Sequence, residues 1–232
     1  GAAGAAAAAI ALGALPLGVR AAGAKTKIGI IGSGRIGGTL GGLWAEAGHE
    51  VMFSSLDLEH DKALAAKHGA NARAGTPREA AAFGDVLLMA VPYRALPQLG
   101  KDLAREIKGK VVIDACNPFV GRDGDIAKWA REKGAGLASA ELLPGARIVR
   151  AFNAVGAARL PEIAKSKGDR TGMPIAGDDA KAIEIASRLI RDVGFEPVLV
   201  GSLAMGKYLI PGTPLAGERS PAEIQRIAKT LS

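Results

Sequence analysis

The sequence predicts an α/β protein with a doubly wound, mainly parallel sheet that additional C-terminal strands extend. From Lys27 onward, short β-branched segments alternate with helical stretches, which is the pattern of repeated βαβ units. Hydrophobic residues make up 48% of the chain but aromatic residues only 4%, so Ala, Val, Ile and Leu must form the core. Such small side chains are typical of helices that pack on a parallel sheet.

Five segments have the composition of buried strands: residues 27–31, 50–53, 85–91, 110–115 and 147–152. Two more strands are expected at residues 173–176 and 196–200, next to a helix over residues 179–192. Because strand signals continue after Leu143, the second half is expected to extend the sheet or form a small lobe, and not to be an all-helical domain.

Capping residues and glycines mark the helix boundaries. Thr76 is expected to cap a helix that carries a proline and a glutamate in its first turn. Ser220 begins the same pattern, which predicts a last helix that ends near Leu231. The glycines at which helices are expected to stop are Gly48, Gly69, Gly109 and Gly194.

The most specific motif lies at residues 27–37, where a buried strand passes directly into a helix through G-x-G-x-x-G. Gly32 permits the tight turn, Gly34 lets the backbone approach a diphosphate, and Gly37 lets the helix pack closely against the strand. The diphosphate would bind the free N–H groups of the helix N-terminus. A glycine-rich turn without a ligand is the alternative. Strand, loop, helix and next strand nevertheless follow in the order of a Rossmann-type dinucleotide-binding domain.

The end of the second strand distinguishes NAD from NADP, because an acid there binds the ribose 2′-OH and repels a 2′-phosphate. Ser54 and Ser55 occupy this position, and His60 follows one helical turn later. Two hydroxyls and a basic side chain suit phosphate oxygens, so the sequence predicts NADP(H). Asp57 is the nearest acid, but it begins the next helix and is expected to act as its N-cap. His60 also fits an ordinary surface position on that helix.

The ends of two further strands lie at the same carboxyl edge of the sheet, where open α/β folds bind their ligands. Residues 90–93 are expected to form the wall beside the cofactor ribose, and the Asn117 amide to bond the nicotinamide carboxamide. Both segments also fit proline-stiffened turns without a ligand. Cys116, with no histidine near it in sequence, is expected to be a small buried residue. The predicted cofactor-binding residues are Gly32, Ser33, Gly34, Arg35, Ile36, Gly37, Ser54, Ser55, His60, Ala90, Val91, Pro92, Tyr93, Asn117 and Pro118.

Seven segments resemble, in order and spacing, the family of coenzyme F420-dependent NADP oxidoreductases, which includes the reductase domain of the six-transmembrane metalloreductases. The segments are KIGIIGSGRIGGTL, AGHEVMFSS, DVLLMAVPY, GKVVIDACNPF, ELLPGARIVRAFNAVG, PIAGDD and GFEPVLVGSL. The resemblance extends from Lys27 to about Tyr208. An ordered set of this kind is far more specific than the glycine loop alone.

The resemblance implies a reductase that transfers a hydride between NADP(H) and a second planar ring, such as coenzyme F420 or a flavin, stacked on the nicotinamide. It implies that Ser33, Ser54 and Ser55 hold the phosphate end of the adenosine. The residues that it places beside the second ring are Asn153, Ala154, Val155, Leu203, Ala204 and Met205. Family members usually carry Arg where this chain has Leu56 and often Lys where it has His60. Weaker binding of NADP(H), or a preference relaxed toward NAD(H), is therefore expected.

Hydride transfer between two rings needs alignment, and it needs neither a general acid nor a nucleophile. The sequence agrees, because it contains no Ser-His-Asp order, no HExxH motif and no paired carboxylates in a suggestive loop except Asp178 and Asp179, which fit a helix N-cap. We therefore assign no catalytic residue and no metal ligand. Two alternatives stay open. One is a non-catalytic NADP(H)-binding sensor. The other is a different Rossmann dehydrogenase, although the 82 residues after Arg150 are few for the helical domain that such enzymes usually append.

Charge and cysteine content narrow the range of partners. The net charge of +7 is spread along the chain without basic runs, so nucleic-acid binding is not expected. The single cysteine, Cys116, excludes an internal disulfide. The expected partners are a small-molecule redox acceptor and, from the family tendency, a second copy of the chain in a homodimer.

Residues 1–19 are rich in Ala and contain no charge, and the segment Ala22-Gly23-Ala24 follows. This pattern resembles the apolar region and cleavage site of an export signal, and its mild hydrophobicity favours the twin-arginine type over a membrane span. A periplasmic protein is therefore expected, and a flexible tail or surface helix in a cytoplasmic protein is the alternative. The expected organisation is a leader (1–24), an NADP-binding Rossmann domain (25–146) and a smaller α/β part (147–232) that completes the sheet and the acceptor site.

Overall fold

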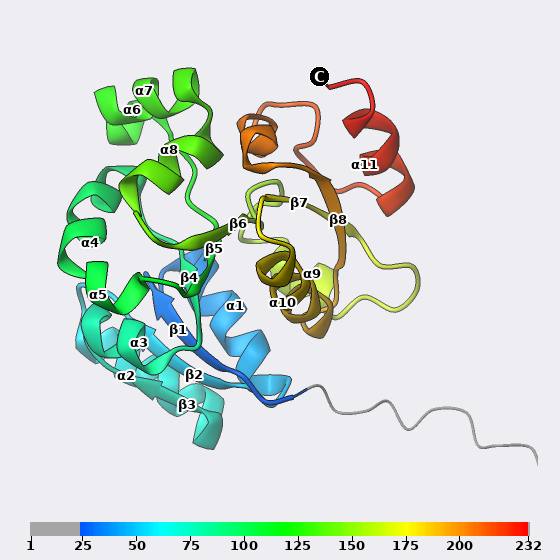
Figure 1. Cartoon of the computed structure of the whole chain (residues 1–232). Coiled ribbons are helices and arrows are strands. Elements are labelled where there is room, and N and C mark those ends of the chain that lie inside the picture. The colour runs from blue at the N-terminus through cyan, green and yellow to red at the C-terminus, as the bar shows by residue number, and fades with distance from the viewer. Residues whose placement is uncertain (1–23, 232) are drawn as a thin grey trace, which may run out of the picture.

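The computed structural model describes residues 24–231 and shows helices on both sides of one central sheet (Figure 1). The expected leader lies, apart from Ala24, outside the described residues. Within them, eight strands form the sheet in the order β3-β2-β1-β4-β5-β6-β7-β8. The strands are β1 (Lys27–Ile31), β2 (Glu50–Ser54), β3 (Ala72–Ala74), β4 (Val86–Met89), β5 (Val111–Asp114), β6 (Arg147–Arg150), β7 (Gly172–Gly177) and β8 (Glu196–Gly201).

The strand order confirms the predicted fold class. Strands β3, β2, β1, β4, β5 and β6 are parallel, as in a doubly wound dinucleotide-binding fold. β7 pairs antiparallel with β6, and β8 pairs parallel with β7, so the second half of the chain extends the same sheet. The chain reverses its direction of winding between β1 and β4, and ligands bind at the carboxyl ends of strands beside such a switch point.

Helices cover both faces of the sheet, and a large hydrophobic core lies on each face, with a third, smaller cluster beside β7 and β8. Alternate residues of β4 serve the two faces. Leu88 belongs to the core that includes residues of α1 and α10, whereas Leu87 and Met89 belong to the core that includes residues of α3, α4, α5 and α8. The helices are α1 (Arg35–Glu46), α2 (Leu58–His68), η1 (Gly69–Asn71), α3 (Pro77–Phe83), η2 (Tyr93–Ala95), α4 (Leu96–Asp102), α5 (Ala104–Ile107), α6 (Val120–Asp123), α7 (Asp125–Lys133), α8 (Ala135–Leu142), α9 (Leu160–Ala164), α10 (Ala180–Asp192), η3 (Leu203–Tyr208) and α11 (Pro221–Ala228).

Trp44 of α1 joins the two halves of the chain. Its ring is buried and meets Phe152 edge-on, with 6.1 Å between ring centroids, and Phe152 meets Phe195 in the same way. The indole N–H donates a hydrogen bond of 2.9 Å to the carbonyl oxygen of Leu189 in α10. Trp44 is therefore a core residue, and one hydrophobic core includes residues from both halves of the chain.

Most predicted boundaries agree with the structure. Capping boxes begin α3 at Thr76 and α11 at Ser220, as predicted. The predicted helix stops all have positive φ, namely Gly48, Gly69, Gly109 and Gly194. Strand β3 was not expected, because Ala and Arg give no β-branched signal, and α11 ends at Ala228, before Leu231. No helix among residues 24–231 is long and apolar enough to cross a lipid bilayer.

Candidate dinucleotide-binding site

The loop between β1 and α1 has the backbone geometry that the glycine spacing predicts. Gly32 has a φ of +96°, and a Cβ atom there would lie 2.5 Å from the carbonyl oxygen of Ala90 at the end of β4. A Cβ atom at Gly37 would lie 2.0 Å from the carbonyl oxygen of Gly32, so only glycine lets α1 pack this closely. A Cβ atom at Gly34 would meet nothing within 4 Å, which leaves the space that a diphosphate needs.

The N-terminus of α1 is suited to an anion. No side chain caps it at Gly34, and no acid stands in its first turn. The first N–H groups of a helix lack acceptors within the helix and carry a partial positive charge. The backbone N–H groups of Gly32 and Ser33 donate to the carbonyl oxygen of Ser54 at 2.9 and 3.0 Å, which fixes the loop against β2. The helix N-terminus is therefore held in place for binding a diphosphate.

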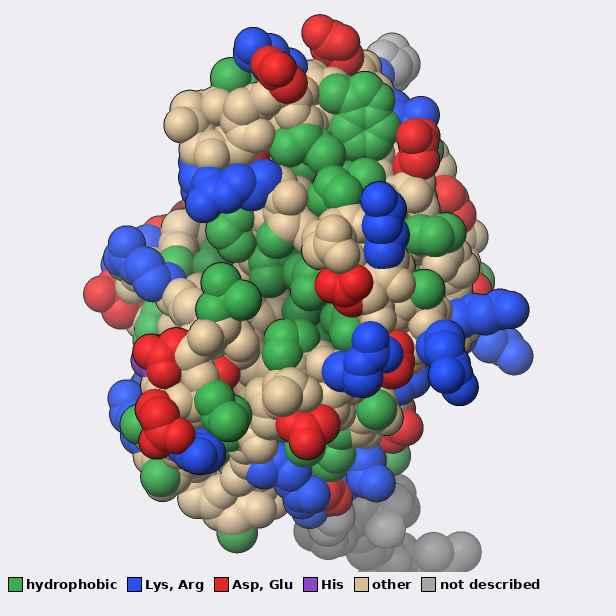
Figure 2. All heavy atoms as spheres, turned by 90° about the vertical axis from the view of Figure 1, so that its left-hand side faces the viewer, with side chains coloured by type: hydrophobic (Ala, Val, Ile, Leu, Met, Phe, Trp, Pro, Cys, Tyr) green, Lys and Arg blue, Asp and Glu red, His purple; other side chains and the backbone are tan. Residues whose placement is uncertain are grey.

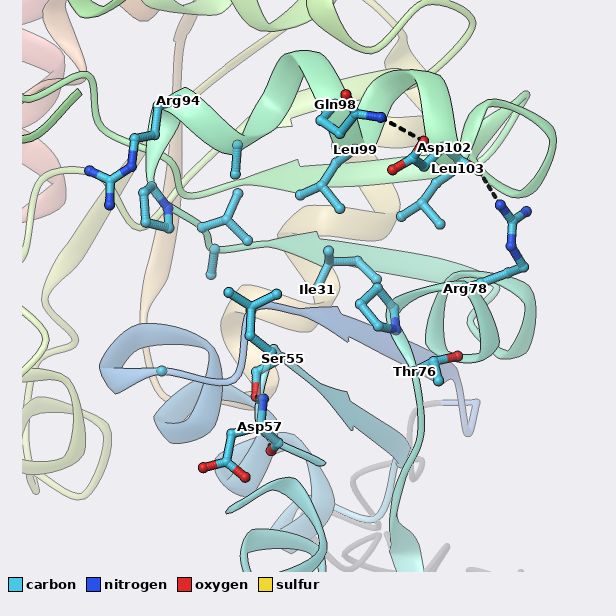
Figure 3. A pocket seen from close by; sticks show the side chains of 18 residues that line it. Ile31, Ser55, Asp57, Thr76, Arg78, Arg94, Gln98, Leu99, Asp102 and Leu103 are labelled. Carbon is cyan, nitrogen blue, oxygen red and sulfur yellow. Dashed lines mark hydrogen bonds between the residues drawn. The ribbon is translucent and has the colours of Figure 1, made fainter. Parts of the chain in front are cut away.

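A cavity of about 940 Å³ lies beside this loop, at the carboxyl ends of β1, β2 and β4. Its volume is that of a ligand-binding cleft. Figure 3 shows α4 on one side and the loop after β2 on the other, with Arg94 and Arg78 at opposite ends. On the face shown in Figure 2, hydrophobic side chains gather in a hollow that charged side chains border. The apolar lining includes Ile31, Leu56, Pro77, Val91, Leu99 and Leu103.

The structure brings one part of the predicted cofactor set to this cavity. Arg35 and Ile36 form the first turn of α1, next to the cavity-lining Gly34. Pro118 is buried and does not line the cavity, and its carbonyl oxygen accepts a hydrogen bond from Arg131. The predicted residues that line the cavity are Gly32, Gly34, Ser55, Ala90, Val91 and Pro92.

Ser33 and Ser54, which were predicted to hold a phosphate, do not line the cavity, and their hydroxyls bond to the protein. Ser54 is fully buried, and its Oγ donates to the carbonyl oxygen of Ile30 at 2.6 Å. Ser33 is also buried, and its Oγ bonds to Asp61 and lies 3.1 Å from the carbonyl oxygen of Ser54. Both hydroxyls therefore hold β1, β2 and α2 together.

Asp61 is a buried carboxylate that the sequence-based prediction missed. It is fully buried on α2 and accepts hydrogen bonds from the hydroxyls of Ser33 and, at 2.9 Å, Ser55. Among the residues of α2, only Asp61 and Ala65 are buried, one helical turn apart on the face toward the protein. The sequence did offer one signal of this burial: Asp61 stands four residues before Ala65, on the same face of the predicted helix.

His60, which was predicted to bind the cofactor phosphate, lies beside the glycine loop, and its ring is bonded to the protein. Its Nε2 lies 3.2 Å from the carbonyl oxygen of Ser33. Asp57 caps α2 as predicted, because its carboxylate accepts the backbone N–H of His60 at 3.0 Å. Both residues thereby fix the start of α2 against the glycine loop.

Tyr93, which was predicted to bind the cofactor, has its side chain in the core. Its phenol donates to the carbonyl oxygen of Ala135 at 3.0 Å and lies 3.0 Å from the hydroxyl of Ser139, both in α8. Burial raises the pKa of the Tyr93 phenol. Cys116 is also buried, as expected, and burial raises the pKa of its thiol.

A buried ion pair connects the ends of β5 and β6. Asp114 and Arg150 face each other in the sheet register, are both fully buried, and are joined by a hydrogen bond of 2.7 Å. The Arg150 guanidinium also donates to the carbonyl oxygens of Cys116 and Leu209, both at 3.0 Å, and to the amide oxygen of Asn117 at 3.4 Å. It therefore connects the loop after β5 with the segment that follows η3.

Asn117 and Asn153 pair beside this arginine. The Asn117 amide N–H donates to the carbonyl oxygen of Asn153 at 3.3 Å, and the Asn153 amide N–H donates to Asn117 Oδ1 at 3.4 Å. Asn153 Oδ1 and Arg150 Nε are buried without a hydrogen-bond partner among the described residues. Phe152 has a φ of +64°, unlike every other described residue except glycines. Strain and unsatisfied polar atoms of this kind concentrate at functional sites.

The other residues predicted to contact the second ring do not share one cavity. Ala154 and Val155 are buried, and Ala204 is exposed. Leu203 packs with the core under α8, whereas Met205 packs against a separate cluster beside β8. None of them lines the cavity described above.

Comparisons with known proteins show what the chain is similar to. Residues 27–118 match the family described as NADP oxidoreductase, coenzyme F420-dependent. Metalloreductase STEAP3 of Rattus norvegicus is 29% identical over 181 residues, which are 78% of this chain and 35% of the relative, so the chain spans about a third of its length. The F420-dependent NADP reductase of Methanothermobacter thermautotrophicus is 29% identical over 205 residues, covering 82% of this chain and 87% of the relative. The crystal structure of a hypothetical protein from Sinorhizobium meliloti has a TM-score of 0.72 at 27% identity, covering 84% of this chain and 95% of that chain.

The matched segment contains most of the features that define the site. It begins with β1 and includes the glycine loop, the loop after β2 and the end of β4, and it ends just after Asn117. The resemblance inferred from the sequence motifs is thereby confirmed. Residues 27–118 are similar to the family described as NADP oxidoreductase, coenzyme F420-dependent.

Proposed function

We propose that the protein is an NADP(H)-dependent oxidoreductase that transfers a hydride between NADP(H) and a planar acceptor of the deazaflavin or flavin type. One observation carries the proposal: the glycine loop and the uncapped N-terminus of α1 border a cavity at the switch point between β1 and β4. The family match over residues 27–118 supports the choice of NADP(H). The names of the relatives support reductase chemistry.

The residues at the site fit a bound dinucleotide. The open space at Gly34 and the amides of α1 suit the diphosphate. The apolar cavity walls at Leu56, Pro77 and Leu99 suit the adenine ring. The nicotinamide supplies the hydride chemistry when it is bound, and the protein supplies binding and orientation.

Asn117 is the residue that best suits the nicotinamide carboxamide. Its Oδ1 accepts hydrogen bonds from Arg150 and Asn153, so the orientation of the amide is fixed. One of its two N–H groups bonds to the backbone of Asn153, which leaves the other for a ligand. An amide held in this way fixes the rotation of the carboxamide and hence of the ring. Hydride transfer needs such alignment, with the two carbon atoms about 3–3.5 Å apart.

The acceptor is proposed to stack near Asn153. Asn153 bonds to Asn117 at the ends of β5 and β6, and its Oδ1 has no partner among the described residues. The strained backbone of Phe152 immediately precedes it. This position supports the placement because an acceptor ring must lie against the nicotinamide face. Water exclusion there follows from the burial of Phe152 and Asn153.

The test combines binding and turnover. Calorimetry with NADPH is expected to show saturable binding. Incubation with NADPH and a panel of flavin, deazaflavin and quinone acceptors is then expected to oxidise NADPH with at least one of them, as measured by its absorbance. Absence of nucleotide binding would overturn the proposal. Binding without oxidation by any acceptor would favour a non-catalytic NADP(H)-binding sensor.

A further inference from the structure

The loop after β2 is where this fold recognises the 2′ position of the adenosine ribose. Ser55, Leu56 and Asp57 form this loop, and all three line the cavity. Figure 3 shows Ser55 and Asp57 across the cavity from α4. Donors or cations at this place favour a 2′-phosphate, whereas a carboxylate favours a free 2′-hydroxyl. The hydrogen bonds of these side chains therefore bear directly on the choice between NADP(H) and NAD(H).

Asp61 accepts hydrogen bonds from the serine hydroxyls that a phosphate would need as donors. Its buried carboxylate accepts the Ser33 hydroxyl through Oδ1 and the Ser55 hydroxyl through Oδ2, the latter at 2.9 Å. A serine hydroxyl has a single proton to donate. A Ser55 proton that is directed at Asp61 is not available to a ligand in the cavity. The carboxylate also places a negative charge directly behind Ser55.

Two basic side chains near this loop are already bonded to other groups. His60 Nε2 lies 3.2 Å from the carbonyl oxygen of Ser33, and Lys62 Nζ lies 2.8 Å from Glu59. The two cations among the residues that line the cavity, Arg78 and Arg94, lie at its opposite ends (Figure 3).

Both cavity-lining arginines are held by other parts of the protein. Arg78 bonds to Glu106 and to the carbonyl oxygen of Asp102, each at 2.6 Å. Arg94 bonds to the carbonyl oxygen of Arg122 at 2.6 Å. A 2′-phosphate at the loop after β2 would therefore face carboxylates with no free cation among the described cavity-lining residues.

We infer that Asp61 is a specificity-determining residue that removes most of the preference for NADP(H) over NAD(H). The inference rests on the proposed function, because it concerns the same dinucleotide site. The wild-type chain is expected to bind NADP⁺ and NAD⁺ with dissociation constants within about tenfold of each other. Replacing Asp61 by Asn is expected to raise the affinity for NADP⁺ about tenfold, because the charge disappears and the single amide oxygen can no longer accept from both serine hydroxyls.

The experiment measures dissociation constants by calorimetry for the full chain. The probes are NADP⁺ and NAD⁺, together with 2′,5′-ADP and 5′-AMP, which differ only in the 2′-phosphate. The variants are Asp61→Asn and Asp61→Leu, and the second replaces a buried carboxylate by an apolar side chain that suits the buried face of α2. The charge control is Asp85→Asn, an exposed acid that precedes β4 at the opposite edge of the sheet.

Both Asp61 variants are expected to shift the NADP⁺/NAD⁺ ratio and the 2′,5′-ADP/5′-AMP ratio by about tenfold, while the Asp85 variant leaves both ratios within about twofold of the wild type. A wild-type preference for NADP⁺ above about 100-fold would overturn the inference but not the proposed function. Unchanged ratios in both Asp61 variants would overturn it as well. Failure of the wild type to bind either dinucleotide would instead overturn the proposed function itself.

Discussion

Two regions of the proposed dinucleotide site hold their polar groups in different ways. Around the cavity, Leu56 and Leu99 form apolar walls, and the nearby hydroxyls are bonded to Asp61. At the ends of β5 and β6, outside the residues that line the cavity, Asp114 and Arg150 form a fully buried ion pair that continues into the paired asparagines. Under the proposed function, the first region would bind by shape and backbone amides, whereas side chains fix the second.

Under the proposed function, this difference predicts that the cavity supplies affinity for the nucleotide, whereas Asn117 and its partners supply orientation of the nicotinamide. Apolar walls and helix amides attract a nucleotide without specifying the angle of a distant ring. A buried ion pair adds little net stability over apolar side chains of similar size, because desolvation offsets the attraction between the charges. Arg150 and Asp114 are therefore better explained by the fixed position that they give to Asn117.

Breaking the buried pair is expected to have the largest effect. Arg150→Met leaves the Asp114 carboxylate buried without its cation, and it removes the donor to the carbonyl oxygens of Cys116 and Leu209. Loss of one partner from such a pair costs about 3–5 kcal/mol. Urea unfolding is expected to show this loss as a lower midpoint with an unchanged m value.

Arg147→Met is the matched control, because Arg147 begins the same strand and pairs with Asp179 where their side chains are 32% and 39% exposed. Its loss of stability is expected to be much smaller. Combining Arg150→Met with Asp114→Leu is expected to recover most of the lost stability but not dinucleotide affinity. Equal losses of stability from the two single arginine variants would contradict the contrast between buried and exposed pairs.

The next largest effect is expected at the glycine loop. Gly34→Val places a side chain in the open space next to the N-terminus of α1, where the diphosphate is proposed to lie. Calorimetry is expected to show affinity for NADPH lowered about 100-fold, or about 2.7 kcal/mol. Gly121→Val is the control, because a side chain there also meets nothing within 4 Å but lies outside the cavity. Wild-type affinity in the Gly34 variant would place the diphosphate elsewhere.

The sequence predicted the backbone of the site better than its side chains. The roles of Gly32 and Gly37 follow from local spacing, and both close approaches are present in the structure. Side-chain directions depend on neighbours that are distant in sequence. Tyr93 turns into the core because Ser139, 46 residues later, lies within hydrogen-bond distance. Ser33 turns inward because Asp61 lies 28 residues later in a helix packed against the loop.

The hydrogen bonds between Asn117 and Asn153 were likewise predicted only in part. Sequence motifs assigned the two residues to neighbouring sites, but no local pattern indicates that an arginine of β6 holds the first of them. In the sequence, Arg150 has the pattern of a polar residue at the end of a strand, where an exposed side chain is expected. Its full burial becomes apparent only when β5 supplies Asp114 in register.

A smaller and more selective effect is expected at Asn117. Asn117→Ala removes the proposed carboxamide partner but leaves the Arg150–Asp114 pair in place. Affinity for NADP⁺ is expected to fall about tenfold, while affinity for 2′,5′-ADP, which lacks the nicotinamide, stays within about twofold. Calorimetry with the two probes measures this difference. Equal weakening of both probes would mean that Asn117 acts on the whole cleft and not on one end.

The smallest expected effect is the contribution of the exposed Arg147–Asp179 pair, at the start of β6, to the pH dependence of stability. Arg147 donates two hydrogen bonds of 2.7 Å to Asp179, and the N–H of Ala182 donates a third at 2.9 Å, so the pKa of Asp179 is held well below its usual value of 3.8. A carboxylate with a lowered pKa in the folded state stabilises that state above its unfolded pKa. This contribution is therefore lost as the pH falls from 3.8 toward the lowered value. Asp179→Asn still caps α10, and its unfolding midpoint in urea is expected to fall less steeply with acid than that of the wild type. The difference is expected to shrink in high salt, because this pair is exposed. An identical acid dependence in the two proteins would mean that the exposed Arg147–Asp179 pair contributes nothing to stability. Of the two pairs on β6, only the buried Arg150–Asp114 pair would then affect the free energy of unfolding.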